Sequence, residues 1–171
     1  MSTPDATTGS RQHSFGWDDP TPTVMAGIER SGLEIWQAIA AGELPRPPVG
    51  ALVDFSIPHV EEGRIAFAAP TAEWMLNPLG TVHGGVITTM LDSAVGCAVH
   101  TTLPVGVGYT TLEIKVNFLR AVPADAGNLI AEGKVVHRGG TVATAEGRLT
   151  SESDGRLLAH ATTTCLILKP R

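Results

Sequence analysis

The sequence contains few cysteines and no pattern of metal ligands. Two occur among 171 residues, Cys97 and Cys165, and neither belongs to a Cys-x-x-Cys pair or to a cluster with histidine. Each lies in an apolar stretch, where a thiol behaves as a small hydrophobic side chain. We therefore expect two structural cysteines, no metal site and no cofactor.

Long apolar runs, basic clusters and phosphate-binding loops are also missing. The apolar segment from Gly84 to about Val99 is shorter than the roughly 20 residues that span a membrane, and the amino terminus lacks the apolar core of an export signal. A net charge of −5 without clustered Lys and Arg argues against a nucleic-acid partner. Gly106-Val-Gly108 lacks the rest of a nucleotide motif. We expect a cytoplasmic protein that binds neither membrane nor nucleic acid.

The remaining composition is typical of a chain with one substantial core, because 43% of the residues are hydrophobic and 17% are charged. We divide the chain into a flexible N-terminal tail (1–22), an N-terminal helix with a proline-rich linker (23–50) and the main domain (51–171). In the tail, Phe15 and Trp17 are the expected anchors. Apolar spacing predicts one helix over 23–41, with Gly42 as its C-terminal stop.

Alternating apolar residues predict an antiparallel sheet. Val53, Phe55 and Ile57 indicate a first strand, and the chain returns in a second strand after the turn at 61–63. Four more strands are expected at 108–118, 128–137, 141–151 and 157–168, with Leu112, Ile114, Val116 and Phe118 as the apolar side of the first of them. The fold class is α+β, an antiparallel sheet wrapped around one long helix.

That helix begins at Gly84 and is apolar on nearly every side, which is typical of a core helix. One carboxylate, Asp92, lies within it. An unpaired charge is costly to bury, so Asp92 is a candidate functional residue. The alternative is that Asp92 belongs to a thin solvated stripe with Thr88, Thr89, Ser93 and Gly96.

The start of the same helix offers a second chemical group. Gly84 and Gly85 place backbone amides without side chains at the first turn, where N–H groups lack intrahelical partners and a carbonyl oxygen or oxyanion can bind. Gly84 and Asp92 are about 12 Å apart along a helix, too far to act on one carbonyl carbon. We therefore expect composite sites between two subunits of a symmetric homodimer.

The stretch Asn77-Pro-Leu-Gly-Thr-Val-His-Gly-Gly85, followed by Asp92 in the next helix, resembles a known family pattern. Together with the blocks at 108–120 and 143–148, it is similar to the phenylacetic-acid-degradation (PaaI-like) type of hotdog-fold acyl-CoA thioesterases. The resemblance extends from about Gly27 to Leu168. It implies the hotdog fold and hydrolysis of an acyl-CoA to free acid and CoA. We expect a homodimer and a further pairing into a dimer of dimers, but the choice between dimer and tetramer stays open.

The resemblance also assigns roles to single residues. Asp92 is the nucleophile or the general base, and Gly84 polarises the thioester carbonyl. Asn77 orients substrate or water, although a plain turn-forming role is the alternative. His83 supports the loop and the substrate carbonyl rather than acting as a base. Thr111 matches a hydroxyl that assists the nucleophile or the reacting water, and the alternative is an ordinary β-branched strand residue. Gly85 and Arg138 are expected to bind substrate, Arg138 at the CoA phosphates.

Two other functions fit the same sequence. A hotdog enoyl-CoA hydratase or dehydratase would need a histidine and a carboxylate that work together, and a non-catalytic acyl-CoA binding module would leave Asp92 without a purpose. The 53–75 region and the first helix are expected to shape the acyl pocket. The acyl group itself, whether aromatic, medium-chain or long-chain, stays open.

Overall fold

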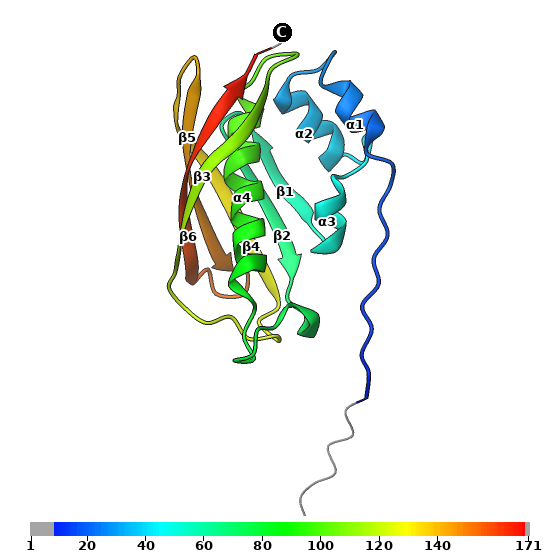
Figure 1. Ribbon diagram of the computed structural model, residues 1–171, viewed down its shortest axis with the longest axis vertical. Coiled ribbons are helices and arrows are strands. Elements are labelled where there is room, and N and C mark those ends of the chain that lie inside the picture. Colours follow the sequence, from blue (N-terminus) through cyan, green and yellow to red (C-terminus); the bar gives the residue numbers. More distant parts are fainter. Residues whose placement is uncertain (1–8, 170–171) are drawn as a thin grey trace, which may run out of the picture.

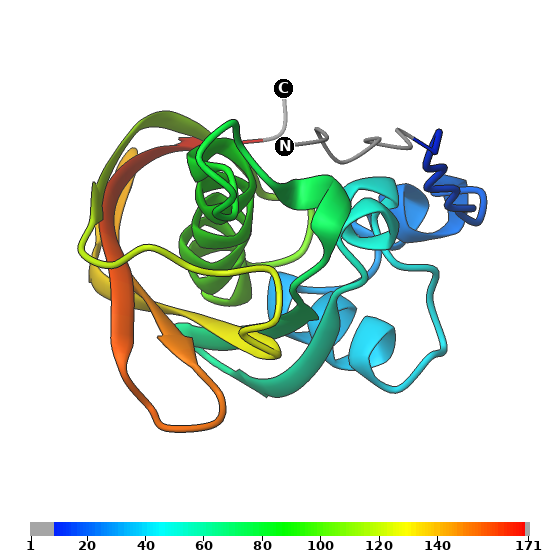
Figure 2. The same cartoon turned by 90° about the horizontal axis from the view of Figure 1, so that it is seen from below.

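The computed structural model describes residues 9–169. In this part of the chain a curved antiparallel sheet wraps around the long helix α4 (Gly84–Thr101), as Figure 1 and the end-on view of Figure 2 show. The strand order is β1-β2-β4-β5-β6-β3, so β1 and β3 are the sheet edges. The strands are β1 (Ser56–Glu61), β2 (Arg64–Pro70), β3 (Gly108–Phe118), β4 (Asn128–Arg138), β5 (Val142–Ser151) and β6 (Leu157–Leu168). The predicted α+β arrangement is confirmed.

Helix α4 lies unusually close to the sheet because two glycines face it. Gly133 of β4 and Gly147 of β5 are directly paired across the two strands. A Cβ on Gly133 would lie 2.1 Å from the carbonyl oxygen of Ala94, and one on Gly147 would lie 2.7 Å from Cγ1 of Val95. No side chain larger than hydrogen fits at either position. At Gly133 helix backbone rests almost directly on strand backbone, and at Gly147 the Val95 side chain fills the space. Leu91, Ala94 and Val95 consequently have no exposed surface.

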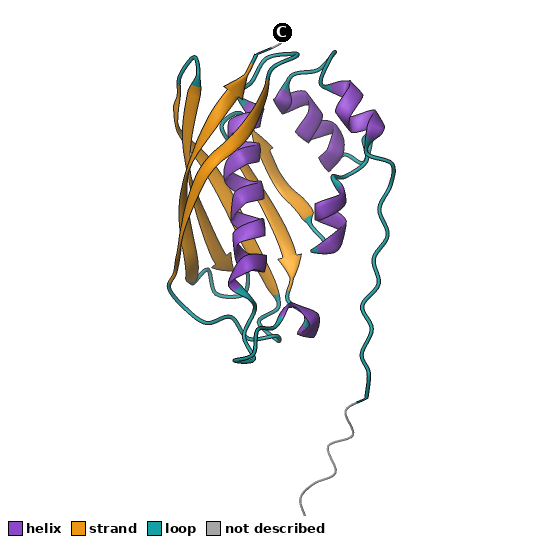
Figure 3. Cartoon of the chain, viewed as in Figure 1, coloured by secondary structure: helices purple, strands orange, loops and turns teal. Residues whose placement is uncertain are grey.

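The N-terminal region forms separate short helices rather than the single helix predicted over 23–41. They are α1 (Thr21–Ala26), α2 (Gly32–Ala40) and α3 (Pro48–Leu52). Ser31 starts α2 with a capping box, in which its hydroxyl accepts the N–H of Glu34 and the Glu34 carboxylate accepts the N–H of Ser31. This reciprocal cap starts a new helix at a position that the prediction placed inside one continuous helix. Figure 3 shows the three helices on the side of β1, away from β5 and β6.

Helix α2 is held against α4 by close backbone contact and by one polar pair. A Cβ on Gly32 would lie 1.9 Å from the carbonyl oxygen of His100, near the end of α4. The indole Nε1–H of Trp36 donates to Nδ1 of His100 over 3.0 Å. Burial lowers the pKa of His100, in keeping with a ring whose Nδ1 must be unprotonated to accept.

The extended segment before α1 contacts the body through residues other than those expected. The guanidinium of Arg11 forms an ion pair of 2.9 Å with Glu73, and the ring of His13 stacks on Trp74 with centroids 4.5 Å apart. Phe15 and Trp17, the predicted anchors, are 44% and 60% exposed, so that prediction was wrong. Residues 1–8 of the expected tail lie outside the described part.

The strand predictions hold with two changes. The first strand begins at Ser56 rather than Val53, because α3 continues to Leu52 and Asp54 then turns the chain with a left-handed φ of 54°. The second change is a β-bulge inside β3, where the pairing with β6 shifts between Thr111 and Glu113. The bulge alters which side of β3 faces the helix.

Candidate active site

Asp92 lies half-buried in the middle of α4 and has a partner on β3. The hydroxyl Oγ1 of Thr111 donates to Oδ1 of Asp92 over 3.0 Å. The other hydroxyls of the predicted stripe bond within their own helix: Thr88 donates to the carbonyl of Gly84, and Ser93 donates to that of Thr89. Among residues 9–169, Asp92 is therefore the one member of the stripe whose side chain is held by another element.

The bulge in β3 is what turns Thr111 toward the helix. Leu112 is the extra residue, and it points away with 57% of its surface exposed. The sequence pattern predicted Leu112 on the apolar side and Thr111 on the opposite one. The structure corrects this, because Tyr109 and Thr111 face α4 before the bulge, and Ile114 faces it after the bulge.

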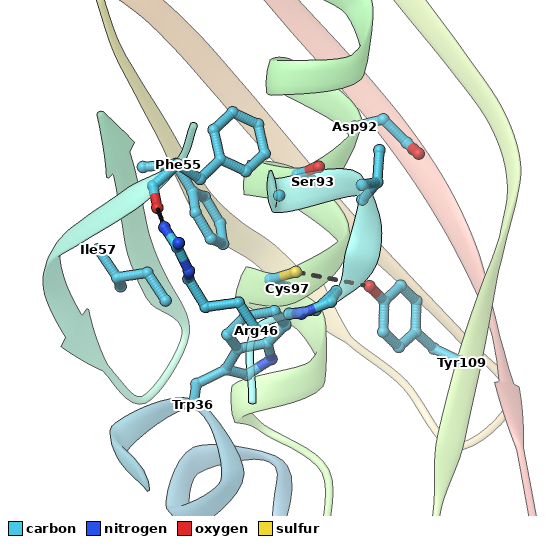
Figure 4. A pocket seen from close by; sticks show the side chains of 12 residues that line it. Trp36, Arg46, Phe55, Ile57, Asp92, Ser93, Cys97 and Tyr109 are labelled. Carbon is cyan, nitrogen blue, oxygen red and sulfur yellow. Dashed lines mark hydrogen bonds between the residues drawn. The ribbon is translucent and has the colours of Figure 1, made fainter. Parts of the chain in front are cut away.

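A cavity of about 220 Å³ opens beside Asp92, and we call it the Asp92 pocket. Its walls come from α4, α2, α3, the linker before α3, the β1–β2 hairpin and β3, as Figure 4 shows. Most of the lining is apolar. The residues labelled there are Trp36, Arg46, Phe55, Ile57, Asp92, Ser93, Cys97 and Tyr109. The prediction that the 53–75 region and the first helix shape the acyl pocket is consistent with a lining that includes Phe55, Ile57, Phe67 and Trp36.

The polar groups of the Asp92 pocket differ in how far they are already engaged. The guanidinium of Arg46 donates to the carbonyl oxygen of Phe55 over 2.6 Å. Burial raises the pKa of the Cys97 thiol and of the Tyr109 phenol, so both stay protonated at neutral pH. Cys97 thus fits the predicted role of a structural thiol, and a nucleophilic role would need a thiolate.

A second depression, which we call the Gly84 hollow, lies at the start of α4 and has a volume of about 340 Å³. His83 is the N-cap, and its Nδ1 accepts the N–H of Gly85 over 2.8 Å. Gly85 was predicted to bind substrate, but its N–H already donates to the ring of His83. Through this bond the ring of His83 supports the loop. Among residues 9–169 no hydrogen bond engages the N–H of Gly84, which lines the hollow. The ring of Phe118 also lines the hollow and lies 3.2 Å from where a Gly84 Cβ would be.

Asn77 also lines the Gly84 hollow, but its side chain closes its own turn. Oδ1 accepts the N–H groups of Leu79 and Thr81, and Nδ2 donates to the hydroxyl of Thr81 over 3.0 Å. Gly80 completes the turn with a φ of 75°, which glycine adopts without strain. The turn-forming role is therefore present, and one N–H of Nδ2 is left for a further partner.

The structure does not bring all predicted residues to one place within a single chain. Asp92 lines one depression and Gly84 lines another, about 12 Å apart along the same helix. Arg138 lines neither. It is exposed at the end of β4, at the tip of the β4–β5 hairpin and at the opposite end of the sheet from Gly84 (Figure 1).

Tyr109 and Arg46 are pocket residues that the sequence interpretation missed. Tyr109 had a detectable signal, since it lies two residues before Thr111 and so on the same side of a strand. Arg46 had none, because the linker reaches the pocket only through tertiary packing. Within residues 9–169 no group of three or more His, Cys, Asp or Glu side chains is arranged to hold a metal ion. In the same range no helix has the length and apolarity that a membrane span needs.

A sheet wrapped around one long helix defines a hotdog-type fold. In this chain the helix has a carboxylate in its middle and a free amide at its start. A family model described as thioesterase superfamily matches residues 79–158. A candidate esterase from Saccharolobus solfataricus is 32% identical over 119 residues, covering 70% of this chain and 82% of that protein. The chain therefore belongs to the thioesterase superfamily.

Solved structures agree with this assignment. A candidate thioesterase from Ralstonia eutropha, related to phenylacetic acid degradation, matches with a TM-score of 0.70 and 32% identity over 77% of this chain and 98% of that one. A Streptococcus mutans protein solved with acetyl-CoA bound matches with a TM-score of 0.61 and 27% identity over 68% of this chain and 90% of that one. The predicted resemblance to hotdog thioesterases of the phenylacetic-acid-degradation type is confirmed.

Proposed function

We propose that the protein hydrolyses acyl-CoA thioesters, with Asp92 of one subunit and the Gly84 amide of another acting on the same carbonyl. The observation that carries this proposal is the separation of the two groups into different depressions on one helix. Each depression holds half of what thioester hydrolysis requires. Two copies are needed to bring the halves together.

The chemistry follows from the two groups. Water adds to the thioester carbon, the C–S bond breaks, and the products are a carboxylate, CoA thiol and one proton. The Gly84 N–H would donate to the carbonyl oxygen as it gains negative charge, a contact whose loss costs about 10²–10³ in rate in comparable sites. Thr111 occupies Oδ1 of Asp92, which leaves Oδ2 to activate the water or to attack the carbon itself.

The exposed edge of the sheet supports a second copy at this position. β3 is an edge strand of 11 residues with Leu112 and Phe118 more than half exposed, and such an edge readily pairs with another strand. Along β3, Thr111 lies beside Asp92 and Phe118 lies beside Gly84. Antiparallel pairing of two β3 strands with Thr111 opposite Phe118 therefore brings each Asp92 beside the other copy's Gly84.

The face of α4 between the two groups supports the same arrangement. The hydroxyls of Thr88, Thr89 and Ser93 each donate to a carbonyl four residues earlier in the helix. They need no outside partner, so a second helix can cover them without leaving a polar group unsatisfied. The acyl-CoA class is supported by the S. mutans relative solved with acetyl-CoA. Its transfer to this chain is part of the proposal, as are CoA phosphate contacts by Arg138 and substrate contacts by Asn77.

Subunit complementation tests the composite site. Asp92→Asn removes the acid, and Gly84→Pro removes the amide proton. Proline is tolerated at the first helical position, and His83 before it has the extended backbone (φ −62°, ψ 135°) that proline requires. Each variant alone should be inactive. After co-refolding in equal amounts, half of the dimers are mixed and each has one intact site, so about one quarter of wild-type activity should return.

Gly84→Ala is the matched control, since it adds the same Cβ beside Phe118 but keeps the N–H. It should retain far more activity than Gly84→Pro. A mixture no more active than its components would show that both groups serve sites within one chain, and would refute the composite site. A panel of acyl-CoA thioesters followed by release of free thiol separates hydrolysis from enoyl-CoA hydration and from binding without turnover.

A further inference from the structure

Tyr109 reaches into the Asp92 pocket through a space that a glycine leaves open. It lies on β3 two residues before Thr111, and its ring packs against α4 at Gly96. A Cβ on Gly96 would lie 2.8 Å from both the hydroxyl oxygen and Cε2 of Tyr109. Any other residue at position 96 would therefore displace the phenol. Figure 4 shows the hydroxyl directed toward the centre of the pocket.

The hydroxyl of Tyr109 has almost no partner there. Its one contact among residues 9–169 is with Sγ of Cys97 at 3.8 Å, and sulfur is a weak hydrogen-bonding atom. No hydrogen bond joins it to the nearby Ser93 hydroxyl in that part of the chain, and Nδ1 of the neighbouring His100 already accepts from Trp36. Burial raises the pKa of Tyr109, so the phenol stays a donor at neutral pH. A buried hydroxyl without a good partner costs free energy unless a ligand supplies one.

The fold sets the depth of this donor relative to the reacting centre. Tyr109 lies two strand residues beyond Thr111, and Cys97 lies five helical residues beyond Asp92. Both spacings correspond to about 7 Å. The hydroxyl thus lies one layer further along a mostly apolar cavity than the carboxylate that would meet the thioester.

We propose that Tyr109 selects acyl groups that carry a hydrogen-bond acceptor about 7 Å from the thioester carbon. This inference rests on the proposed acyl-CoA hydrolysis and names the substrate class of the same site. The hydroxyl donates to that acceptor, while Trp36, Phe55 and Phe67 enclose the apolar part of the chain. Purely aliphatic acyl groups of the same shape leave the donor unsatisfied and react more slowly.

The test compares two thioesters of nearly equal shape, 5-oxohexanoyl-CoA with a distal ketone and 5-methylhexanoyl-CoA with a methyl group in its place. Wild-type kcat/KM should favour the oxo substrate by about tenfold. Tyr109→Phe, which removes one oxygen and keeps the ring, should abolish this preference by slowing the oxo substrate and leaving the methyl substrate within about twofold. Equal slowing of both substrates, or wild-type preference for the methyl substrate, would overturn the proposal.

Binding to Asp92→Asn by calorimetry separates this inference from the proposed function. A preference for the oxo thioester that disappears in Asp92→Asn/Tyr109→Phe supports the role of Tyr109 even if no thioester is hydrolysed. Turnover of both substrates without any preference refutes the role of Tyr109 and leaves hydrolysis standing. Absence of both binding and turnover for the two thioesters overturns the role of Tyr109, while acyl-CoA hydrolysis is overturned only if the wider panel of thioesters also fails. Thermal unfolding of the Tyr109→Phe variant checks that the fold is retained.

Discussion

The hydroxyl of Thr111 donates a 3.0 Å hydrogen bond to Oδ1 of Asp92, and this bond joins the edge strand β3 to the middle of α4. No other hydrogen bond of the Asp92 side chain occurs within residues 9–169. The carboxylate is therefore oriented by a strand at the edge of the sheet rather than by its own helix. Any partner that pairs with β3 would act directly on the geometry of Asp92.

Replacing Asp92 with asparagine should reduce turnover by about 10²–10⁴-fold, the usual contribution of a general base. The amide is nearly isosteric and can still accept from Thr111, so the fold should persist. Release of free thiol from an acyl-CoA measures the loss, and thermal unfolding measures the retained stability. Turnover close to that of the wild type would exclude Asp92 from the reaction.

Thr111→Val should lower kcat about tenfold or more, because a hydrogen bond to a charged group is worth about 1.5–3 kcal/mol. Thr111 acts as a positioning residue, so Thr111→Ser should restore most of the activity and the pH dependence of kcat. Thr110→Val is the control, since Thr110 is an exposed neighbour on the same strand. Equal losses in the Val and Ser variants at position 111 would point to packing rather than to the hydroxyl.

His100 should make stability depend on pH. Its pKa is lowered by burial, so in the window between that lowered value and the ordinary value near 6.5 the unfolded chain binds more protons than the folded one. The contribution of His100 to the free energy of unfolding is then fully present above about pH 6.5, and it is lost as the pH drops toward the pKa of the folded state. Urea unfolding between pH 5 and 8 measures this slope.

The variant His100→Asn should flatten that slope, because an asparagine oxygen can accept from Trp36 but does not titrate. The control is His137→Asn, at an exposed position on β4, which should leave the slope as in the wild type. A slope unchanged by the substitution at His100 would place the pH dependence elsewhere in the chain.

Gly133→Ala should destabilise the protein by about 1–3 kcal/mol or more, the range for overpacked cores. The added Cβ would meet the Ala94 carbonyl oxygen at 2.1 Å, and neither backbone can move away without disturbing the sheet or α4. The free energy of unfolding in urea measures the effect. Gly140→Ala, at a hairpin tip with no atom within 4 Å, should stay within about 0.5 kcal/mol of the wild type.

Much of the fold could be predicted because its signals are local. The alternating runs of β4, β5 and β6 and the apolar circumference of α4 appear in the sequence with nearly the same bounds as in the structure. The break between α1 and α2 was also readable, since Ser31 and Glu34 form the capping-box spacing, but apolar periodicity took precedence in the interpretation. The start of β1 was missed because Val53 and Phe55 are buried outside the strand.

The candidate site was predictable to the extent that it depends on one helix. The positions of Asp92 and Gly84, and their separation, follow from the length of α4. The bulge at Leu112 was not predictable, because it arises from the pairing of β3 with β6 and has no mark in the alternation. Arg46 enters the pocket only because the linker before α3 packs over it, a long-range contact that no local pattern encodes.

The glycine pair beneath α4 makes the position of Asp92 independent of the shape of the pocket wall opposite it. Because no strand side chain fits between α4 and the sheet at Gly133 and Gly147, the height of Asp92 above the sheet does not depend on strand side chains at these two positions. The opposite wall of the pocket, built by α2, α3 and the linker, can accept substitutions without raising or lowering the carboxylate. Substrate range can therefore diverge in evolution through the N-terminal segment, while the reacting geometry is inherited unchanged.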